Sequence, residues 1–341
     1  MEKEYVIAID IGGTNLKADL VDREGNISDF SYTPSHASEG REALLASLKT
    51  IISLQKDCGR KVVGIAAGSP GTVNNSTGVI DYMQAHIPNW TGTKLGEFLS
   101  REAGVPSQID NDANVIALGE YWKGAGQGAK CLLALALGTG LGSGLVLDGK
   151  VMHGPFFNAV EVGHTIVCPD GANVACSCGN FGCAESFISP GKMIGRAHMS
   201  MQVGVPSVLG GYPKLTIAQI QERYKNDDVP EFNVKDMVDH YEDDFLCKRL
   251  IDDCMKYLAL LIYNLTKCYD PDVISLGGGM FKSADFFLPK LYEQLDRYYV
   301  SPDCPAKYKI KVSELGDLAG IYGAAKLAWD HIDALRGKKN A

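Results

Sequence analysis

The composition of this chain is that of an ordinary globular protein. It has 341 residues, of which 45% are hydrophobic and 22% are charged. A chain of this length is expected to form two domains, each with its own core. Its formal net charge of −8 argues against electrostatic binding to nucleic acid or to an anionic membrane surface.

The first residues predict a cytoplasmic protein. The sequence MEKEYVIAID places charges before a short apolar run and lacks the apolar core and cleavage site of a signal peptide. No apolar stretch approaches the length of a membrane span. Because cytosolic thiols stay reduced, the ten cysteines are interpreted as thiols or metal ligands before disulfides.

Two glycine-rich hairpins are predicted, one in each half of the chain. The residues around Gly12-Gly13-Thr14 are typical of a strand, a turn and a second strand, and so are those around Gly138-Thr139-Gly140. The matching apolar flanks indicate a diverged internal duplication. Backbone N–H groups at such turns suit phosphate oxygens, and the threonines add hydroxyl donors. One such turn alone is usually an ordinary hairpin, whereas two that face each other across a cleft would form a phosphate clamp.

Two polar features accompany the first half of the chain. Asp10 ends the first predicted strand, where its carboxylate could hold Mg²⁺ beside a triphosphate or could simply cap the turn. The loop at 66–80, AAGSPGTVNNSTGVI, is rich in Gly, Pro and Asn and follows an apolar strand. Its backbone donors could bind a polyol, and Gly71 in this loop is a candidate substrate contact.

The segment 109–122, IDNDANVIALGEYW, predicts a strand that passes directly into a helix. Asp110 and Asn111 end the strand, and Asp112 begins the helix. Asn111 or Asp112 could serve only as the helix N-cap. Alternatively, the Asp112 carboxylate could face a cleft and act as a general base toward a hydroxyl during phosphate transfer. Asn111 would then hydrogen-bond the same substrate.

The densest group of reactive side chains lies in the segment 161–186, EVGHTIVCPDGANVACSCGNFGCAES. A C-x-C-x4-C pattern and an upstream histidine predict a closed, structural zinc site of four ligands: His164, Cys176, Cys178 and Cys183. The alternative is a loop of free thiols beside a hydrogen-bonded histidine, and Cys168 is a spare candidate ligand. A redox role would favour C-x-x-C, which is absent, and a Cys–His nucleophile would single out one cysteine.

Three further features belong to the carboxy-terminal half. Gly277–Gly279 follow another apolar strand and could let a nucleoside approach the backbone closely. The helix predicted at 245–270 has apolar residues at helical spacing, which favours a core position, although a dimer face is an alternative. The segment 199–244 is expected to form helices and loops without an assigned role, and its acidic residues 242–244 are expected to be solvated.

Taken in this order, the segments resemble the ROK family of bacterial sugar kinases and related repressors, within the actin-like ATPase superfamily. The resemblance spans most of the chain, and Glu-x-Gly-His followed by C-x-C-G-x-x-G-C-x-E is its most specific part. Eight segments carry it: DIGGT (10–14), GSPGTVNNSTG (68–78), NDAN (111–114), LGTGLGSG (137–144), EVGH (161–164), CSCGNFGCAES (176–186), LGGGM (276–280) and AGIYGAAKLA (319–328).

The resemblance implies a role for individual residues. Asp112 corresponds to the catalytic base, which activates the sugar hydroxyl that attacks the γ-phosphate of ATP. With Gly71 added from the polar loop, the expected sugar contacts are Gly71, Asn111, Asp112, Glu161, His164 and Glu185. The expected zinc ligands are His164, Cys176, Cys178 and Cys183. With Asp10 added, the expected nucleotide and phosphate contacts are Asp10, Gly12, Gly13, Thr14, Gly138, Thr139, Gly140, Gly277, Gly278 and Gly279.

The resemblance also implies the architecture and the ligands. The expected fold is α/β, with two actin-like (ribonuclease H-like) domains around a central cleft and a zinc-binding loop. A small domain would span 1–115 plus 318–341, and a large domain would span 116–317. The expected ligands are a sugar, ATP, Mg²⁺ and a structural Zn²⁺ that orients the sugar-binding loop, and a homodimer is expected.

The implied activity is transfer of the γ-phosphate of Mg·ATP to a hexose hydroxyl, with O6 of glucose as the first choice. N-acetylmannosamine, N-acetylglucosamine, allose, mannose and fructose are alternatives, and Asn74 stands where many relatives carry Asp. The repressor branch has an amino-terminal helix-turn-helix, for which the strand that begins by Tyr5 is expected to leave no room. A non-catalytic sugar sensor would lack Asp112 or the glycine turns, and this sequence has both.

Overall fold

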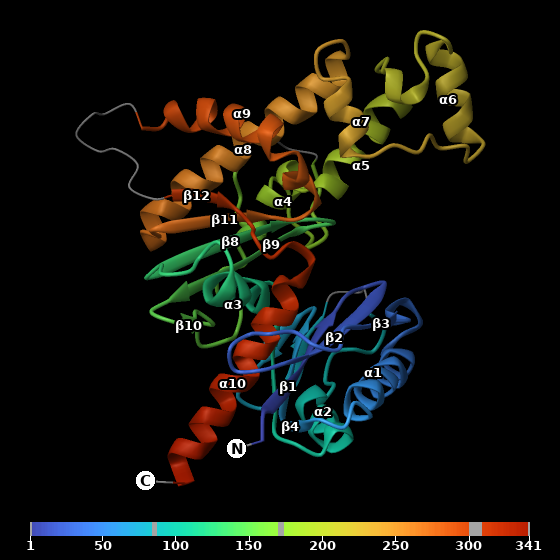
Figure 1. The fold of residues 1–341 in the computed structure, drawn as a ribbon. Coiled ribbons are helices and arrows are strands. Elements are labelled where there is room, and N and C mark those ends of the chain that lie inside the picture. Colours follow the sequence, from blue (N-terminus) through green and yellow to red (C-terminus); the bar gives the residue numbers. More distant parts are fainter. Residues whose placement is uncertain (1, 84–86, 170–173, 300–308, 340–341) are drawn as a thin grey trace.

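The protein is built around two five-stranded mixed sheets (Figure 1). This computed structural model describes residues 2–83, 87–169, 174–299 and 309–339. The first sheet has the order β3-β2-β1-β4-β7, with strands β1 (Glu4–Ile11), β2 (Asn15–Val21), β3 (Ser31–Pro34), β4 (Lys61–Ser69) and β7 (Ser107–Asn111). The second has the order β10-β9-β8-β11-β12, with β8 (Cys131–Leu137), β9 (Leu141–Leu147), β10 (Lys150–Val151), β11 (Val273–Gly277) and β12 (Lys309–Val312). A short ribbon of β5 (Thr72–Asn74) and β6 (Val79–Tyr82) stands apart from both.

The two sheets correspond strand by strand. In the first, β1 pairs antiparallel with β2 and parallel with β4. In the second, β8 pairs antiparallel with β9 and parallel with β11. Each sheet therefore begins with a hairpin whose turn is one of the two predicted glycine-rich sequences. This correspondence confirms the predicted internal duplication.

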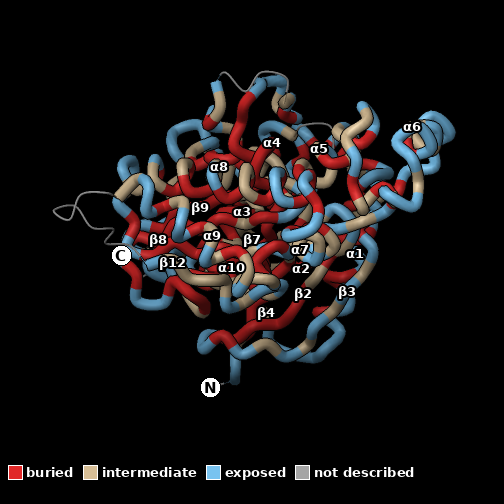
Figure 2. The backbone as a smooth tube through the Cα atoms, turned by 90° about the horizontal axis from the view of Figure 1, so that it is seen from above, coloured by how far each residue is buried: buried red, intermediate tan, exposed pale blue. Residues whose placement is uncertain are grey.

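Each sheet is covered by its own set of helices. The bounds are α1 (Arg41–Lys56), α2 (Leu95–Ala103), α3 (Asp112–Lys123), α4 (Ala184–Ile188), α5 (Pro190–Gln202), α6 (Ile217–Lys225), α7 (Val234–Asp239), α8 (Phe245–Tyr269), α9 (Ala284–Asp296) and α10 (Ala319–Lys339). Helices α1 and α2 share an apolar core with the first sheet, whereas α8 and α9 share one with the second. Figure 2 shows the buried chain concentrated along the strands and the helix faces that cover them. No described helix is long and apolar enough to cross a membrane.

The long helix α8 confirms the core interpretation of its apolar spacing. Leu250, Cys254, Leu258, Leu261 and Leu265 are all buried. Because these residues point into the second sheet's core, they are unavailable as a dimer face. The expected homodimer stays a prediction.

The polar segment 199–244 forms the end of α5 followed by α6 and α7, as expected. Figure 1 shows α6 at the outer edge of the molecule. The prediction that residues 242–244 are all solvated is wrong for Asp244, which is buried. Its carboxylate caps α8 by accepting from Cys247 N at 2.9 Å and also accepts from Val208 N at 2.8 Å, so the burial is compensated by hydrogen bonds.

Helices α3 and α10 lie between the two sheets (Figure 1). Helix α3 contacts β8 and β9 of the second sheet as well as β4 of the first, and α10 contacts β1 and β4. The expected domain boundary after residue 115 falls inside α3. The division into a small and a large domain therefore stays our proposal, with α3 as the element shared between them.

The crossing of α3 and α10 requires glycine on both helices. A Cβ atom added to Gly119 would lie 2.1 Å from the carbonyl oxygen of Ala319. A Cβ atom added to Gly323 would lie 1.7 Å from the carbonyl oxygen of Val115. Both distances are far below van der Waals contact, and the opposing atoms are backbone, so neither neighbour can rotate away.

We therefore expect Gly323→Ala to lower the free energy of unfolding by about 3 kcal/mol through overpacking. Gly337→Ala is the matched control, because Gly337 lies on the same helix and a Cβ atom added to it would have nothing within 4 Å. The control should be neutral or slightly stabilising, since alanine favours helix. Chemical denaturation of both variants checks this, and equal stability of the two would contradict the crossing.

Candidate active site

Three cavities form a continuous row between the sheets. The loop-side cavity, of about 450 Å³, shares Asn111, Glu161, His164 and Glu185 with the central cavity, of about 360 Å³. The central cavity in turn shares Ile116, Ala136 and Gly278 with the strand-side cavity, of about 430 Å³. Asp112 lines the central cavity. A molecule bound in either end cavity can therefore extend toward Asp112.

The turn from β7 into α3 places Asp112. Asn111 is the N-cap of α3, because its Oδ1 accepts from Ala113 N at 2.9 Å and from Asn114 N at 3.2 Å. The capping interpretation is thus confirmed for Asn111 and leaves Asp112 in the first turn of the helix. The side-chain amide of Asn111 donates to the carbonyl oxygen of Gly71 at 3.1 Å, which brings the polar loop to the same place.

The electrostatic surroundings of Asp112 suit a base. Burial, aided by the nearby carboxylates of Asp10 and Glu161, raises the pKa of Asp112 to about 6, while the N–H of Ala113 opposes the shift. Burial likewise raises the pKa of Glu161 and of Asp10, with Lys17 opposing it at Asp10. A carboxylate with a pKa close to neutral pH can both remain ionised and accept a proton efficiently.

Glu185 joins the cysteine loop to the second hairpin turn. Its Oε2 accepts from Leu141 N at 3.0 Å, and its Oε1 accepts from Ser177 Oγ at 3.3 Å. A Cβ atom added to Gly140 would lie 2.5 Å from Glu185 Oε2. A side chain at position 140 would therefore displace this carboxylate from its present position, a constraint that the interpretation of the turn as a phosphate clamp did not include.

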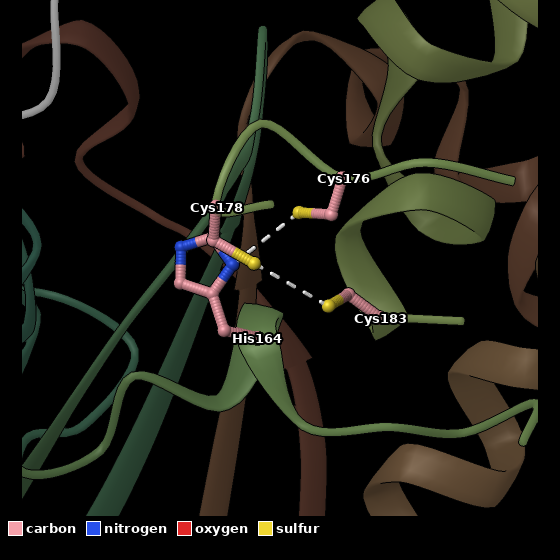
Figure 3. Close-up of side chains that lie close together, drawn as sticks. All are labelled: His164, Cys176, Cys178 and Cys183. Atoms are coloured by element: carbon pink, nitrogen blue, oxygen red, sulfur yellow. Dashed lines mark hydrogen bonds between the residues drawn. The ribbon is translucent and has the colours of Figure 1, made fainter. Parts of the chain in front are cut away.

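The four predicted metal ligands converge (Figure 3). Their donor atoms all lie within 4.8 Å of one another. His164 Nδ1 is 3.5 Å from Cys176 Sγ, and Cys178 Sγ is 3.6 Å from Cys183 Sγ. Thiolates at about 2.3 Å from a tetrahedral zinc lie about 3.8 Å apart, so these residues fit the ion. Cys168 lies outside the group and accepts from Tyr257 Oη at 3.1 Å.

The two glycine turns lie at exposed hairpin tips. Gly138 and Gly140 line the central cavity. Among the described residues that line the three cavities, Gly12, Gly13, Thr14 and Thr139 are not included. The N–H groups of Gly12 and Gly138 close their own turns by donating to Asn15 O and Gly140 O, each at 3.0 Å. These two amides are therefore not available as phosphate donors, and the role of the turns stays a prediction.

The strand-side cavity contains the third glycine run. Gly277, Gly278 and Gly279 line it together with Asp10. Sequence reasoning missed the other charged residues there, which are Lys17, Glu120, Lys282 and Asp317. Lys17 Nζ is 3.9 Å from Asp10 Oδ2, and the hairpin register that pairs Asp10 directly with Lys17 could have identified it.

Glu120 carried no comparable signal in the sequence. Its carboxylate is buried and accepts from Ser313 Oγ at 2.5 Å, Leu315 N at 3.2 Å and Ala125 N at 2.8 Å. It thereby fixes the segment between β12 and α10 that lines the strand-side cavity. Two of these donors, Ser313 and Leu315, lie nearly two hundred positions away along the chain, so no local pattern indicates them.

Comparison with known proteins identifies the family. The family model described as ROK family matches residues 6–331. A glucokinase of Halalkalibacterium halodurans is 30% identical over 332 residues, which cover 96% of this chain and 96% of that protein.

Solved structures share the fold. A ROK family glucokinase from Streptomyces griseus, in complex with glucose and AMPPNP, superposes with a TM-score of 0.74 at 25% identity and covers 96% of this chain and 99% of its own. A ROK family transcriptional regulator, a homologue of the E. coli MLC protein, superposes with a TM-score of 0.80 at 25% identity and covers 98% of this chain and 80% of its own. Because the family model matches nearly its whole length and its fold is the actin-like α/β fold of these structures, this chain belongs to the ROK family of sugar kinases and related regulators.

Proposed function

We propose that this protein is an ATP-dependent hexose kinase that transfers the γ-phosphate of Mg·ATP to a sugar hydroxyl. The observation that carries the proposal is the position of Asp112, whose pKa burial raises to about 6, in the central cavity between two larger ones. The similarity to a glucokinase that was crystallised with glucose and an ATP analogue supports assigning the sugar to one end of the row and the nucleotide to the other.

The sugar would occupy the loop-side cavity. Glu161 and Glu185 line it as hydrogen-bond acceptors for hydroxyl groups, and Asn111 offers a side-chain amide. If zinc binds His164 through Nδ1, which faces Cys176, the opposite ring nitrogen would carry a proton and donate to a hydroxyl. This alternation of acceptors and donors suits a polyol, which presents both functions at every hydroxyl.

The nucleotide would occupy the strand-side cavity, where Gly277–Gly279 leave the backbone accessible. Mg²⁺, when bound beside Asp10, would neutralise charge on the phosphate groups. The sugar hydroxyl would attack the γ-phosphorus while Asp112 accepts the hydroxyl proton. The bond from the γ-phosphorus to the bridging oxygen breaks, and ADP leaves with the electron pair.

Glucose is the first choice of substrate because the relative from Halalkalibacterium halodurans is a glucokinase. Asn74 does not line the loop-side cavity among the described residues. Its side chain instead donates to Asp81 at 3.2 Å and accepts from Thr77 N at 3.2 Å. The exchange of Asp for Asn at this position is therefore expected to act on the loop rather than directly on a sugar hydroxyl.

A sugar-responsive regulator is the second candidate, favoured by the structural similarity to a ROK family transcriptional regulator. The two candidates differ in chemistry. A regulator needs to bind sugar without transferring phosphate, whereas a kinase consumes ATP only when the correct sugar is present. A panel of hexoses and N-acetylhexosamines, assayed for sugar-dependent ADP release, separates them.

We further propose that His164, Cys176, Cys178 and Cys183 hold a structural zinc ion. Closed sites with four protein ligands leave no open position for a substrate. The chemistry supplied by this ion is therefore structural: it would fix the loop that carries Glu185 and the neighbouring Ser177, both of which line the loop-side cavity.

Replacing the proposed base should separate catalysis from binding. We expect Asp112→Asn to lower kcat by about 10³-fold while glucose affinity, measured by calorimetry, changes little. Asp57→Asn is the matched control, because Asp57 is an exposed aspartate at the end of α1. Turnover of Asp112→Asn close to that of the control would show that another group accepts the proton.

The pH dependence of kcat/KM should report the same carboxylate. A general base is active when deprotonated, and the pKa of Asp112 is raised to about 6. We therefore expect kcat/KM to rise with pH through this value and to level off above about pH 7. A profile that stays flat from about pH 5 to about pH 8 would contradict Asp112 as the base.

The metal site predicts one zinc ion per chain by elemental analysis. We expect Cys178→Ser to abolish zinc binding and to lower the thermal midpoint, because a structural zinc contributes directly to folding. Cys168→Ser is the control, since Cys168 is a nearby loop cysteine outside the group, and it should keep its zinc. A stable, active wild-type protein without zinc would exclude the site.

A further inference from the structure

The carboxylate of Asp110 organises the turn that carries the proposed base. Asp110 is the last buried residue of β7, with only 1% of its surface exposed. Its Oδ1 accepts from Asn111 N at 2.7 Å and from Asn114 Nδ2 at 3.1 Å. These two bonds tie the end of the strand to the first turn of α3, so Asp110 helps to define where Asp112 begins the helix.

The third partner of Asp110 comes from the other sheet. His153 Nε2 lies 2.6 Å from Asp110 Oδ2. His153 follows β10 at the edge of the second sheet, and its neighbour Met152 is held there by donating to Leu145 O at 2.9 Å. The pair is separated by 43 positions in the sequence, and it connects the first sheet to the second directly beside the β7–α3 turn.

The chemistry of this contact fixes the donor. A carboxylate oxygen at 2.6 Å can only accept, because an ionised aspartate has no proton to give. Nε2 of His153 therefore carries the hydrogen and donates it to Asp110. With three donors directed at it, the buried carboxylate is well compensated, and loss of the imidazole would leave Oδ2 without this partner.

Further contacts join the β5–β6 ribbon to the segment that follows β10. Thr72 Oγ1 of β5 is 3.5 Å from Asn158 Oδ1, and both residues line the loop-side cavity. Asn75, in the turn between β5 and β6, has its side-chain amide 3.5 Å from His153 Nδ1, the ring nitrogen that can accept when Nε2 donates to Asp110. Polar contacts therefore connect the β5–β6 ribbon to the segment after β10 at the loop-side cavity, whereas α3 and α10 meet through glycine.

We propose that His153 is a positioning residue for phosphoryl transfer. By holding Asp110 from the segment after β10, it sets the β7–α3 turn, and with it Asp112, relative to Glu161 and Glu185, which follow β10 along the chain. This inference rests on the proposed kinase function. The reaction requires Asp112 within hydrogen-bond reach of a sugar hydroxyl, and a displacement of about 1 Å can cost about 10²-fold in rate.

The test compares His153→Ala with His153→Gln in the full-length protein. Glutamine carries an N–H donor of similar reach, whereas alanine removes the donor. We expect His153→Ala to lower kcat by about 10²-fold with the KM for ATP unchanged, and His153→Gln to recover most of that loss. His240→Ala is the matched control, because His240 is partly exposed and contacts Asp243 on the surface; it should keep full activity.

A merely structural role would give a different result. If His153 only stabilised the fold, His153→Ala would reduce the fraction of folded protein without changing the kcat of the folded molecules. Activity is therefore expressed per glucose-binding site counted by calorimetry, and the kcat obtained in this way would match that of the wild type. The double variant Asp110→Asn with His153→Ala should lose no more kcat than the larger single loss, since both members act through one contact. Equal losses for His153→Ala and His153→Gln, or additive losses in the double variant, would overturn the inference.

Failure of the proposed kinase function has a separate signature. If the wild type releases no ADP with any sugar of the panel, the kinase assignment fails and the positioning role fails with it. If the wild type and His153→Ala are equally active while Asp112→Asn is not, the kinase assignment holds and only the role of His153 is overturned.

Discussion

The arrangement of the site depends on the way α3 is held by backbone contacts. On one side, Gly119 of α3 meets Ala319 O of α10, and on another, Gly144 of β9 would place a Cβ atom 2.7 Å from the side chain of Ala117. Side chains as short as these leave no flexible atoms at the interfaces, so the helix has little freedom to shift between the two sheets. Asp112 is the first residue of this helix. Its position is thereby determined by close packing in the middle of the molecule rather than by a surface loop, which favours a reproducible position for its carboxylate.

The burial that raises the pKa of Asp112 also lowers the stability of the folded protein at neutral pH. Its folded-state pKa of about 6 lies above the ordinary value of an aspartate, about 3.9. The contribution of this group to folding is therefore most favourable below about pH 4 and is lost as the pH rises through about 6. At neutral pH the protein carries a carboxylate that water would solvate better. Two features offset the cost in part: Ala113 N donates to the carboxylate at 2.9 Å, and the amino-terminal end of α3 favours negative charge. A carboxylate that is stabilised no more than this keeps its affinity for a proton.

Local patterns predicted much of this structure, and contacts between distant residues account for what they missed. The duplicated hairpins, α8 and the convergence of four metal ligands follow from periodicity and from spacing within a short segment. The sequence could assign the N-cap of α3 only to Asn111 or Asp112, because both residue types are good caps. The burial of Asp244, by contrast, depends partly on Val208, and the limited space beside Gly140 depends on Glu185. These requirements arise when segments far apart in the sequence meet, so a residue pattern around either partner does not contain them.

The two glycine-rich turns differ in length and in their supports: residues 12–15 join β1 to β2, whereas residues 138–140 join β8 to β9. In the first, Ser35 holds the turn by donating from its hydroxyl to Gly13 O at 2.7 Å and from its amide to Thr14 O at 2.9 Å. In the second, the strand that follows the turn is held by Glu185, through Leu141 N. Ser35 lies on the first sheet's side and lines none of the three cavities among the described residues, whereas Glu185 lines both the loop-side and the central cavity. The second turn is therefore linked through one carboxylate to the place where a sugar would bind, and the first is not.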